Sequence, residues 1–379
     1  MSAARTRVLF VQGAGVRAGA ERALLARLHD LSDQDVDATV AFLARGPFRD
    51  EVRATGTRVV DLDPLPRLRH VIRTRASFAQ LAGLARAQAD VVEACGEKMA
   101  ALAGWAARRA GRPCVFNLQD QPLREPRAAG IQAVGATSRP ALTVVPSKWM
   151  RDALPRALYA HTHVVPNALV LDDLPTTPAG IRGELGWPED AFVVGLFGRL
   201  VAWKGAEVLV RAAARLAAEH PEARFLVVGG TLFGLEPAFR ARLEALIGEL
   251  GLGERVALTG HREDSLALML DCDVVCHCSQ EPEPFGMVVV EAMALGRPTI
   301  ATRSRGPEEV IEDGRTGLLV SPADDRALAQ AIAGLIRDGA RRSAIADAGR
   351  QAARRDFSSR AVAPRLAAIY HDLARTATP

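Results

Sequence analysis

Short apolar runs alternate with longer mixed stretches along the whole chain. Runs of this kind are typical of parallel strands buried on both faces, and the stretches between them predict connecting helices. One such helix is expected over residues 20–31, AERALLARLHDL. A first series of strands is predicted at residues 8–11, 39–44, 59–62, 91–95, 114–118 and 142–146.

A second series of apolar runs follows, and together the two series hold too many strands for one ordinary sheet. Between them, residues 164–181 carry Pro and Thr that interrupt any period, and we interpret this segment as an interdomain linker. The pattern predicts an α/β protein of two Rossmann-like, doubly wound domains facing a central cleft, with ligands at the carboxyl ends of the strands. The second series lies at residues 192–198, 225–230, 256–260, 273–278, 299–303 and 317–321.

Length and composition agree with two globular domains. A chain of 379 residues exceeds what one hydrophobic core usually holds, and 49% hydrophobic with 24% charged residues is typical of a soluble protein. No apolar run approaches the length of a membrane span, and the first ten residues lead into a strand rather than a secretory signal. We therefore expect a cytoplasmic protein, with peripheral contact at the inner membrane face as a further option.

The cysteines indicate reduced thiols, because the five of them show no paired C-x-x-C spacing. Cys272, Cys276, His277 and Cys278 could be interpreted as a metal cluster. A buried strand is the favoured interpretation, because residues 276 and 278 would face one side of a strand and residue 277 the other.

Charge is distributed unevenly. Residues 1–170 hold 24 Lys and Arg against 15 Asp and Glu, whereas residues 171–379 hold 24 against 29. A basic cluster in the first half could meet an anionic acceptor or a lipid surface, whereas nucleic acid is not expected. A solvated helix face is the favoured interpretation. The cluster comprises Arg67, Arg69, His70, Arg73 and Arg75.

The loop after the first strand contains Gly13, Gly15 and Ala18, which spell G-x-G-x-x-A. This spacing resembles a dinucleotide fingerprint, but the helix is predicted to start only near Gly19, and no ribose-binding acid follows the second strand at residues 44–46. We therefore predict a loop that faces a phosphate or a sugar. An NADP-dependent oxidoreductase is the alternative.

Two segments of the second half carry the remaining candidate chemistry. In GLFGRLVAWKG, Arg199 and Lys204 could clamp a diphosphate. In EPEPFGMVVVEAMALG, Pro284 and Gly286 predict a turn, so that a helix begins near Met287 with its free amides directed at a ligand. Glu283 then lies on the loop and Glu291 on the first turn of the helix, where carboxylates suit sugar and ribose hydroxyls.

These segments, with VVPNALVLDDL and GAERALL, resemble glycosyltransferase family four of the GT-B fold, the retaining enzymes that use nucleotide sugars. The resemblance implies transfer of a hexose-type sugar from a UDP- or GDP-sugar to a hydroxyl of a glycan, a lipid-linked molecule or a small molecule. It implies no metal and no other cofactor. It also implies an acceptor-side domain over 1–167, a donor-binding domain over 168–355, and a last helix, about 356–379, that packs back on the first domain.

The resemblance assigns roles to individual positions of the second half. Arg199 and Lys204 match the cations on the donor diphosphate, Glu283 the carboxylate near the donor hexose, and Glu291 the one on the ribose. Other donor-binding positions are Gly198, Phe285, Gly286, Met287 and Val288, with His261 and Arg262 beside the base.

In the first half the expected ligand-facing residues are Gly13, Gly15, Gly19, Gln119 and Asp120. Many relatives carry a His near the end of the strand that reads VFNLQDQPL here. Gln119 cannot carry a proton, so either it orients the acceptor by hydrogen bonds or the matching loop lies elsewhere.

Two further alternatives bear on the function. D-x-D pairs, which bind metal in transferases of another fold, occur at residues 35–37, 61–63 and 271–273, and we interpret them as chance. A GT-B-like binding protein without turnover is the alternative outside enzymology. The sequence leaves open the donor base, the sugar, the acceptor, the linkage and the oligomeric state.

Overall fold

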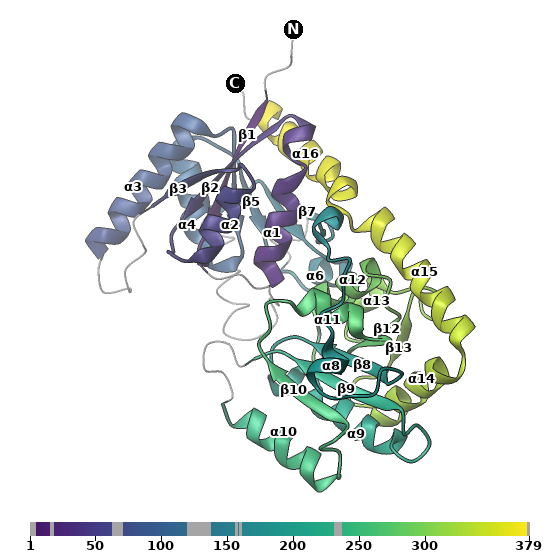
Figure 1. The fold of residues 1–379 in the computed structure, drawn as a ribbon. Coiled ribbons are helices and arrows are strands. Elements are labelled where there is room, and N and C mark those ends of the chain that lie inside the picture. Colours follow the sequence, from purple (N-terminus) through teal and green to yellow (C-terminus); the bar gives the residue numbers. More distant parts are fainter. Residues whose placement is uncertain are drawn as a thin grey trace. The chain divides into compact units, whose positions relative to one another are not determined.

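The computed structural model describes residues 5–15, 19–62, 71–119, 138–155, 158, 161–230 and 237–376. The chain forms two compact units, and each has its own parallel sheet (Figure 1). Unit 1 comprises Met1–Val170 and Phe357–Pro379, and unit 2 comprises Leu171–Asp356. The boundary at Val170 lies inside the segment that the sequence marks as a linker, three residues beyond the predicted end of the first domain.

Unit 1 contains a seven-stranded sheet of order β3-β2-β1-β4-β5-β6-β7, in which every neighbouring pair is parallel. The six strands predicted here are confirmed, whereas β7 was missed, because it is a three-residue edge strand with no fully buried side chain. The strands are β1 (Thr6–Gln12), β2 (Val36–Phe42), β3 (Arg58–Asp61), β4 (Val91–Cys95), β5 (Cys114–Asn117), β6 (Leu142–Val145) and β7 (Thr162–Val164).

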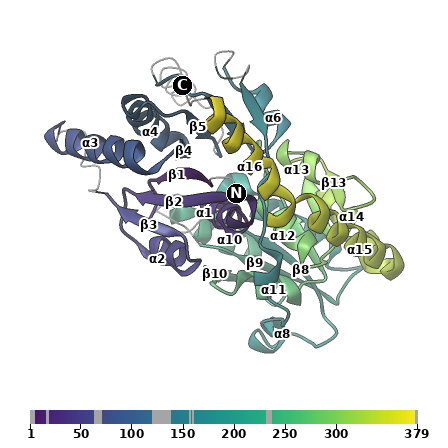
Figure 2. The same cartoon turned by 90° about the horizontal axis from the view of Figure 1, so that it is seen from above.

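Helices cover both faces of this sheet (Figure 2). Because strand side chains alternate, Val8 and Phe10 pack with α1, α2 and α16, and Leu9 and Val11 pack with α3, α4 and α6. The predicted helix at 20–31 is confirmed as α1. The helices are α1 (Gly19–His29), α2 (Pro47–Ala54), α3 (Val71–Gln88), α4 (Glu97–Ala110), α6 (Lys148–Asp152) and α16 (Ser359–Thr376), with the short 3-10 turn η1 (Ser32–Gln34).

The chain returns to unit 1 beside the place where it leaves. Leu169 N donates to Phe357 O at 2.8 Å, and Ser359 N donates to Leu169 O at 2.8 Å. Helix α16 then packs against α1 and strands β1 and β4, so the last helix completes one face of the first sheet.

Unit 2 contains a parallel sheet of order β10-β9-β8-β11-β12-β13. This order matches that of the first six strands of unit 1 and is the doubly wound Rossmann arrangement, so the predicted fold class is confirmed. All six predicted strands are present: β8 (Phe192–Phe197), β9 (Ala223–Val228), β10 (Val256–Gly260), β11 (Val274–His277), β12 (Thr299–Thr302) and β13 (Leu318–Val320).

The helices of unit 2 also lie on both faces of its sheet. Helices α9, α10 and α14 share one apolar cluster with Val194 and Leu196, and α8, α11 and α12 share another with Val193 and Phe197. The elements are η2 (Leu171–Asp173), α8 (Ile181–Glu184), η3 (Ala202–Lys204), α9 (Ala206–Leu216), α10 (Pro237–Glu249), α11 (Ser265–Asp271), α12 (Met287–Ala294), α13 (Gly306–Val310), α14 (Asp325–Arg337) and α15 (Gly339–Asp356).

The cysteines around β11 are core residues. Cys276 and Cys278 are buried in the cluster formed with α9, whereas His277 points to the other face and hydrogen-bonds Ser279. The buried-strand interpretation is thus confirmed. Within the described ranges, no three His, Cys, Asp or Glu side chains gather as the ligands of a metal ion would. Among the same residues, no helix combines the length and the apolar character needed to span a bilayer.

Candidate active site at the switch point of the second sheet

Lys204 and Glu283 of unit 2 lie together at the point in the sheet where the strand order reverses. Strands β8 and β11 are neighbours, and the chain leaves β8 toward β9 but leaves β11 toward β12. The loops that follow these two strands therefore diverge at the carboxyl edge of the sheet, which is where doubly wound sheets bind ligands. Lys204 lies on the first loop and Glu283 on the second.

Backbone contacts join the two loops. Gln280 N donates to Trp203 O at 2.7 Å. Gly205 adopts φ +75°, and a Cβ atom there would lie 2.0 Å from Cys278 O. Only glycine permits both this conformation and this approach. The glycine therefore sets how closely the turn bearing Lys204 approaches the end of β11.

Glu283 is the centre of the cluster. Its Oε2 accepts from Lys204 Nζ at 2.6 Å and from Ser279 Oγ at 3.0 Å, and it lies 3.6 Å from His277 Nε2. The side chains of Lys204 and Glu283 are each only 15% exposed. All of these contacts converge on Oε2, and Oε1 has no partner among the described residues. One oxygen is thus anchored, and the other can accept a hydrogen bond from a ligand.

The backbone of Glu283 is held by the loop after β12. Glu283 N donates to Ser304 O at 2.7 Å, and Gly306 N donates to Glu283 O at 2.9 Å. A Cβ atom on Gly306 would lie 2.5 Å from Phe285 N, so a larger residue would displace this loop. Glu283 is therefore positioned from both its side chain and its backbone.

The ionisation of Glu283 follows from this setting. Burial opposes a charged carboxylate, but the charge of Lys204 and the nearby imidazole of His277 outweigh it, and together they hold the pKa of Glu283 well below its usual range. The carboxylate is therefore ionised at neutral pH.

This pKa predicts a pH-dependent contribution to stability. Because the folded-state pKa lies below that of the unfolded chain, the contribution is complete above about pH 4.3 and is lost as the pH falls further. Urea unfolding of wild type and Glu283→Gln should therefore give a difference in unfolding free energy that is smaller at pH 3.5 than at pH 7. Equal differences at both pH values would contradict the pairing.

Two cations lie beside one aromatic ring. Lys204 Nζ is 4.3 Å, and Arg199 Cζ 5.5 Å, from the centroid of the Trp203 ring. Arg199 is exposed and forms no ion pair with any residue that the structure describes. The ring orients both side chains by cation–π contact, and the guanidinium of Arg199 remains able to bind an anion.

Helix α12 begins at Met287, as predicted. Gly286 precedes it with φ +93° and offers no capping side chain, so the first amides of the helix are open to an anion. Phe285 is buried, and Val288 packs against the neighbouring apolar cluster. Glu291 differs from expectation: it is the fifth residue of α12, on the second turn, and is only 2% exposed.

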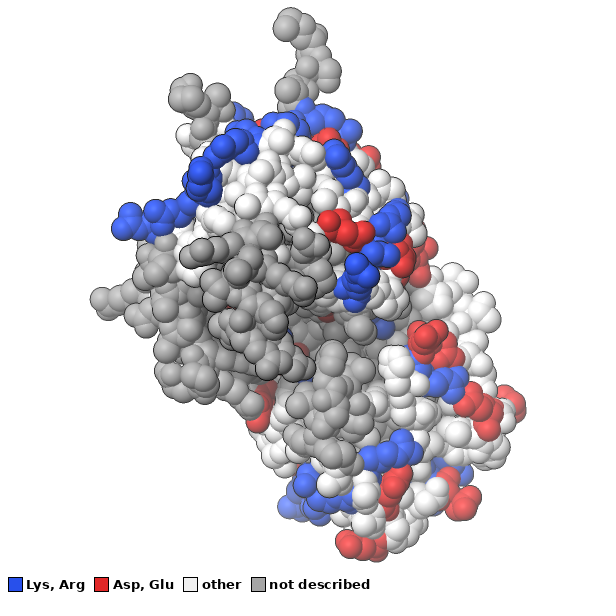
Figure 3. Space-filling view, turned by 90° about the vertical axis from the view of Figure 1, so that its left-hand side faces the viewer, with Lys and Arg blue, Asp and Glu red and all other residues white. Residues whose placement is uncertain are grey.

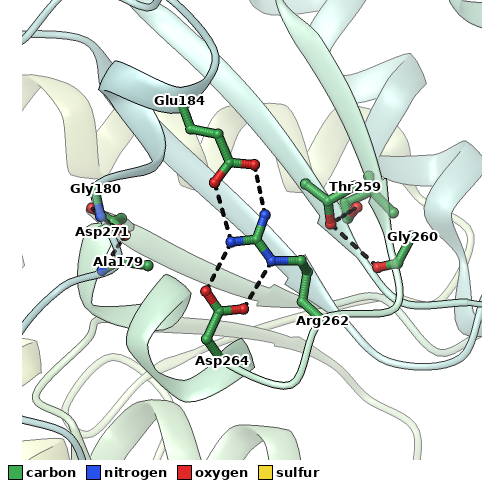
Figure 4. Close-up of polar contacts among 9 residues, drawn as sticks. Ala179, Gly180, Glu184, Thr259, Gly260, Arg262, Asp264 and Asp271 are labelled. Carbon is green, nitrogen blue, oxygen red and sulfur yellow. Dashed lines mark hydrogen bonds and ion pairs between the residues drawn. The ribbon is translucent and has the colours of Figure 1, made fainter.

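The residues predicted beside a base lie after β10. His261 is exposed and lies close to Gly230. A Cβ atom added to Gly230 would lie 3.2 Å from the Cβ atom of His261. Arg262 is occupied elsewhere, because its guanidinium binds Glu184 and Asp264 with two hydrogen bonds each (Figure 4). The hydrogen bond with Asp264 is the largest cause, and that with Glu184 the next, of a pKa of Arg262 that is raised above its ordinary value.

The D-x-D pair in unit 2 has a structural role. Asp271 accepts from the backbone N–H groups of Ala179 and Gly180, which attaches the start of α8 to α11 (Figure 4). Asp273 pairs with Arg182 at 2.8 Å and accepts from Val193 N. Both carboxylates are thus committed to holding the fold, in agreement with the interpretation that this pair is not a metal motif.

In unit 1 the glycine-rich loop is explained by packing. Gln12 Oε1 accepts from Gly13 N and Ala14 N, and a Cβ atom on Gly15 would lie 2.2 Å from Arg45 O. This close contact with the loop after β2 accounts for the glycine at position 15, and the expectation that Gly13 and Gly15 face a ligand stays a prediction. Helix α1 begins at Gly19, as predicted, and Ala18 lies outside the described residues.

Gln119 lies just beyond the carboxyl end of β5 and is held by neighbouring amides. Its Nε2 donates to Asn117 Oδ1 at 2.8 Å, and its Oε1 accepts from Asn167 Nδ2 at 2.8 Å. Asp120 lies outside the described residues, as do Arg67, Arg69, His70 and the side chains of Arg73 and Arg75.

Comparison with known proteins agrees with this arrangement. Residues 17–173 match the model for Glycosyltransferase Family 4, and residues 179–352 match that for Glycosyl transferases group 1. The chain belongs to glycosyltransferase family four. The two matches extend over both units, and neither these models nor the relatives below support an NADP-dependent oxidoreductase.

Other glycosyltransferases are similar to parts of the chain. A D-inositol 3-phosphate glycosyltransferase from Corynebacterium urealyticum is 38% identical over 198 residues, which is 51% of this chain and 46% of that protein. An alpha-D-kanosaminyltransferase from Streptomyces kanamyceticus is 31% identical over 186 residues, 49% of this chain and 47% of that protein. The chain thus spans about half the length of the curated relatives it matches.

A solved structure of another protein has the same fold over nearly the whole chain. HepE from Anabaena, crystallised with UDP-glucose, superposes with a TM-score of 0.85 at 28% identity, covering 97% of this chain and 100% of that one. The GT-B assignment is therefore confirmed.

The sequence gives no signal for three residues that contact Lys204 or Glu283 in the structure. Trp203 was not singled out, Ser279 was unnoticed, and His277 was considered only as a metal ligand. The alternation along β11 does place His277 opposite the core cysteines, but its proximity to Glu283 depends on the turn that follows.

Proposed function

We propose that the chain is a retaining glycosyltransferase that moves a hexose-type sugar from a nucleoside diphosphate sugar to an acceptor hydroxyl. The observation that carries this proposal is the Lys204–Glu283 pair at the switch point of the second sheet, with Glu283 Oε1 unpartnered among the described residues beside the start of α12. A cation, a carboxylate and open helix amides at one place suit a ligand that combines phosphates with hydroxyls. The UDP-glucose complex of HepE supports a nucleotide sugar as that ligand.

The proposed chemistry is the stabilisation of a leaving diphosphate. The bond between the anomeric carbon and the phosphate oxygen breaks as the acceptor oxygen bonds to the same face of the sugar. The acceptor proton passes to the departing phosphate oxygen. Arg199, Lys204 and the amides near Met287 stabilise the charge on the phosphate, and Glu283 Oε1 accepts from a sugar hydroxyl.

Other assignments complete the proposal. Glu291 binds the ribose, Gly198 and residues 285–288 line the sugar and phosphates, and His261 adjoins the base. We propose that transfer needs no metal, because Arg199, Lys204 and the amides near Met287 would stabilise the leaving phosphate. We place the reaction in the cytoplasm.

A donor panel tests the function. Thermal shift and slow sugar release are measured with UDP-, GDP-, ADP- and dTDP-sugars and with NADP, each with and without EDTA. We expect one nucleotide sugar to stabilise the protein and to release sugar whether or not EDTA is present. Binding without release would favour a binding protein, a response to NADP alone would overturn the proposal, and an inverted anomer in the product would contradict retention.

We further propose that unit 1 contacts an anionic membrane through the outer face of α4. Trp105 on this face is 45% exposed, and Lys98, Arg108 and Arg109 are exposed on the same helix, whose single acid is Glu97. Figure 3 shows one face of the molecule, with Lys and Arg side chains along its upper left edge. An amphipathic indole among cations suits the interface of anionic lipid.

Vesicle binding tests this surface. Wild type should sediment with vesicles of phosphatidylglycerol and phosphatidylcholine but not with pure phosphatidylcholine, and Trp105→Ser with Arg109→Glu should reduce binding at least tenfold, since each charge near such a surface contributes about 1 kcal/mol. Sugar release by unit 2 should be unchanged. Equal binding of variant and wild type would contradict the assignment.

A further inference from the structure

A buried carboxylate lies at the centre of unit 1. Glu93, in the middle of β4, is 0% exposed. Its Oε1 accepts from Arg27 NH1 at 2.9 Å and from Asn117 Nδ2 at 3.0 Å, and its Oε2 accepts from the Tyr370 hydroxyl at 2.5 Å. These donors come from α1, the end of β5 and α16, so three separate elements converge on one side chain.

From Glu93 a chain of amides leads to the carboxyl edge of the sheet. Asn117 accepts from Gln119, and Gln119 accepts from Asn167, each at 2.8 Å. Asn117 and Asn167 are 3% and 5% exposed, whereas Gln119 is only partly buried. Of these three amide side chains, Gln119 is therefore the best placed to reach a ligand.

The direction of each hydrogen bond from Glu93 through Asn117 to Gln119 follows from the charge of Arg27. Arg27 has only donors, and with Glu93 ionised as its counter-ion Oε1 can only accept, so it accepts from both Arg27 and Asn117. Asn117 must then turn its NH2 group to Glu93 and its carbonyl to Gln119. Gln119 must in turn direct its NH2 group to Asn117 and its carbonyl to Asn167. The orientation of an amide is normally ambiguous, but here the guanidinium fixes it.

We propose that Glu93 is a positioning residue that, through Asn117, holds Gln119 with an N–H group directed toward the acceptor site. The second N–H group of Gln119 Nε2 then donates a hydrogen bond to an oxygen of the bound acceptor. Gln119 thus favours an acceptor that presents a lone pair there, a hydroxyl or a phosphate oxygen, over one that presents an ammonium group. This inference rests on the proposed function and concerns the acceptor side of the same reaction.

Two variants test it. Arg27→Met with Glu93→Leu replaces the buried pair by apolar side chains of similar size, a change that is often tolerated, and it frees Asn117 to turn over. Gln119→Glu leaves the shape of a partly exposed side chain but removes its donors. Tyr370→Phe is the matched control, because it removes one hydrogen bond to Glu93 and leaves the arm through Asn117 intact.

The first readout is the side-chain NH2 signal of Gln119 in the full chain labelled with 15N-glutamine. We expect one pair of resonances in wild type and in Tyr370→Phe, and shifted or doubled resonances in the Arg27→Met, Glu93→Leu variant. Since Glu93 has no direct contact with Gln119 among the described residues, an unchanged signal would overturn the proposal, as would an equal change in Tyr370→Phe.

The second readout is sugar release to water, which takes the place of the acceptor hydroxyl, from the donor that the panel identifies. Gln119→Glu should lower kcat about fivefold to tenfold, the usual effect of one hydrogen bond, with donor KM unchanged. An unchanged kcat would overturn the role of Gln119. Absence of release in wild type would instead contradict the proposed function, and the amide signal would still decide whether Glu93 orients Gln119.

Discussion

Glu283→Gln should lower kcat for sugar release and transfer by about two to three orders of magnitude, the usual cost of removing one preorganised electrostatic group. The amide keeps the size of the side chain but loses the charge that binds Lys204 at 2.6 Å. Lys204 is then free to bind phosphate more strongly in the ground state, so the nucleotide should bind at least as tightly while turnover falls. Initial rates with the identified donor, together with nucleotide titration by calorimetry, measure the two effects separately.

A matched carboxylate on the surface provides the control. Glu312 pairs with Arg315 in the same unit and its side chain is 60% exposed, so Glu312→Gln should leave kcat unchanged. If Glu283→Gln weakened nucleotide binding and left kcat intact, Glu283 would be a binding residue for the nucleotide and its proposed place beside the hexose would be wrong.

Gly205→Ala should destabilise the protein by about 3 kcal/mol or more. Alanine at φ +75° costs about 1–2 kcal/mol, and the new methyl group, 2.0 Å from Cys278 O, must also push the two site loops apart. In a unit of this size such a loss lowers Tm by roughly 10 °C, which calorimetry detects. Sugar release should fall as well, because Lys204 is the neighbouring residue.

Gly334→Ala is the corresponding control. Gly334 lies inside α14, and no described atom beyond its chain neighbours and the adjacent backbone of its own helix lies within 4 Å of the position that an alanine methyl group would take. Alanine should therefore be neutral or stabilise the helix by up to about 1 kcal/mol. A small Tm change for Gly205→Ala, similar to that for Gly334→Ala, would contradict the close approach of the two loops.

The strands could be predicted because buried parallel strands are continuous apolar runs, and twelve of them were found in this way. Strand β7 escaped because THV at residues 162–164 is short and only partly buried, so its residues carry little apolar signal. The start of α12 was predictable from local chemistry, since Pro284 and Gly286 act on their own neighbours.

Contacts between distant residues could not be predicted in the same way. Lys204 and Glu283 are 79 positions apart, and the sequence alone assigned them to separate ligand groups without indicating that they bind each other. The close approach of Gly15 to Arg45 O could not be predicted either, because Arg45 lies on a loop after another strand. The engagement of Arg262 by Glu184 was missed for the same reason.

The paired backbone at Leu169 and residues 357–359 has a consequence for engineering. Because the chain leaves unit 1 and returns to it within one hydrogen-bonded pair, residues 171–356 are an insert whose two ends emerge side by side. Such an insert can be exchanged as a cassette with little strain at the joins. Grafting the second unit of a relative between Val170 and Phe357 should therefore yield folded chimaeras.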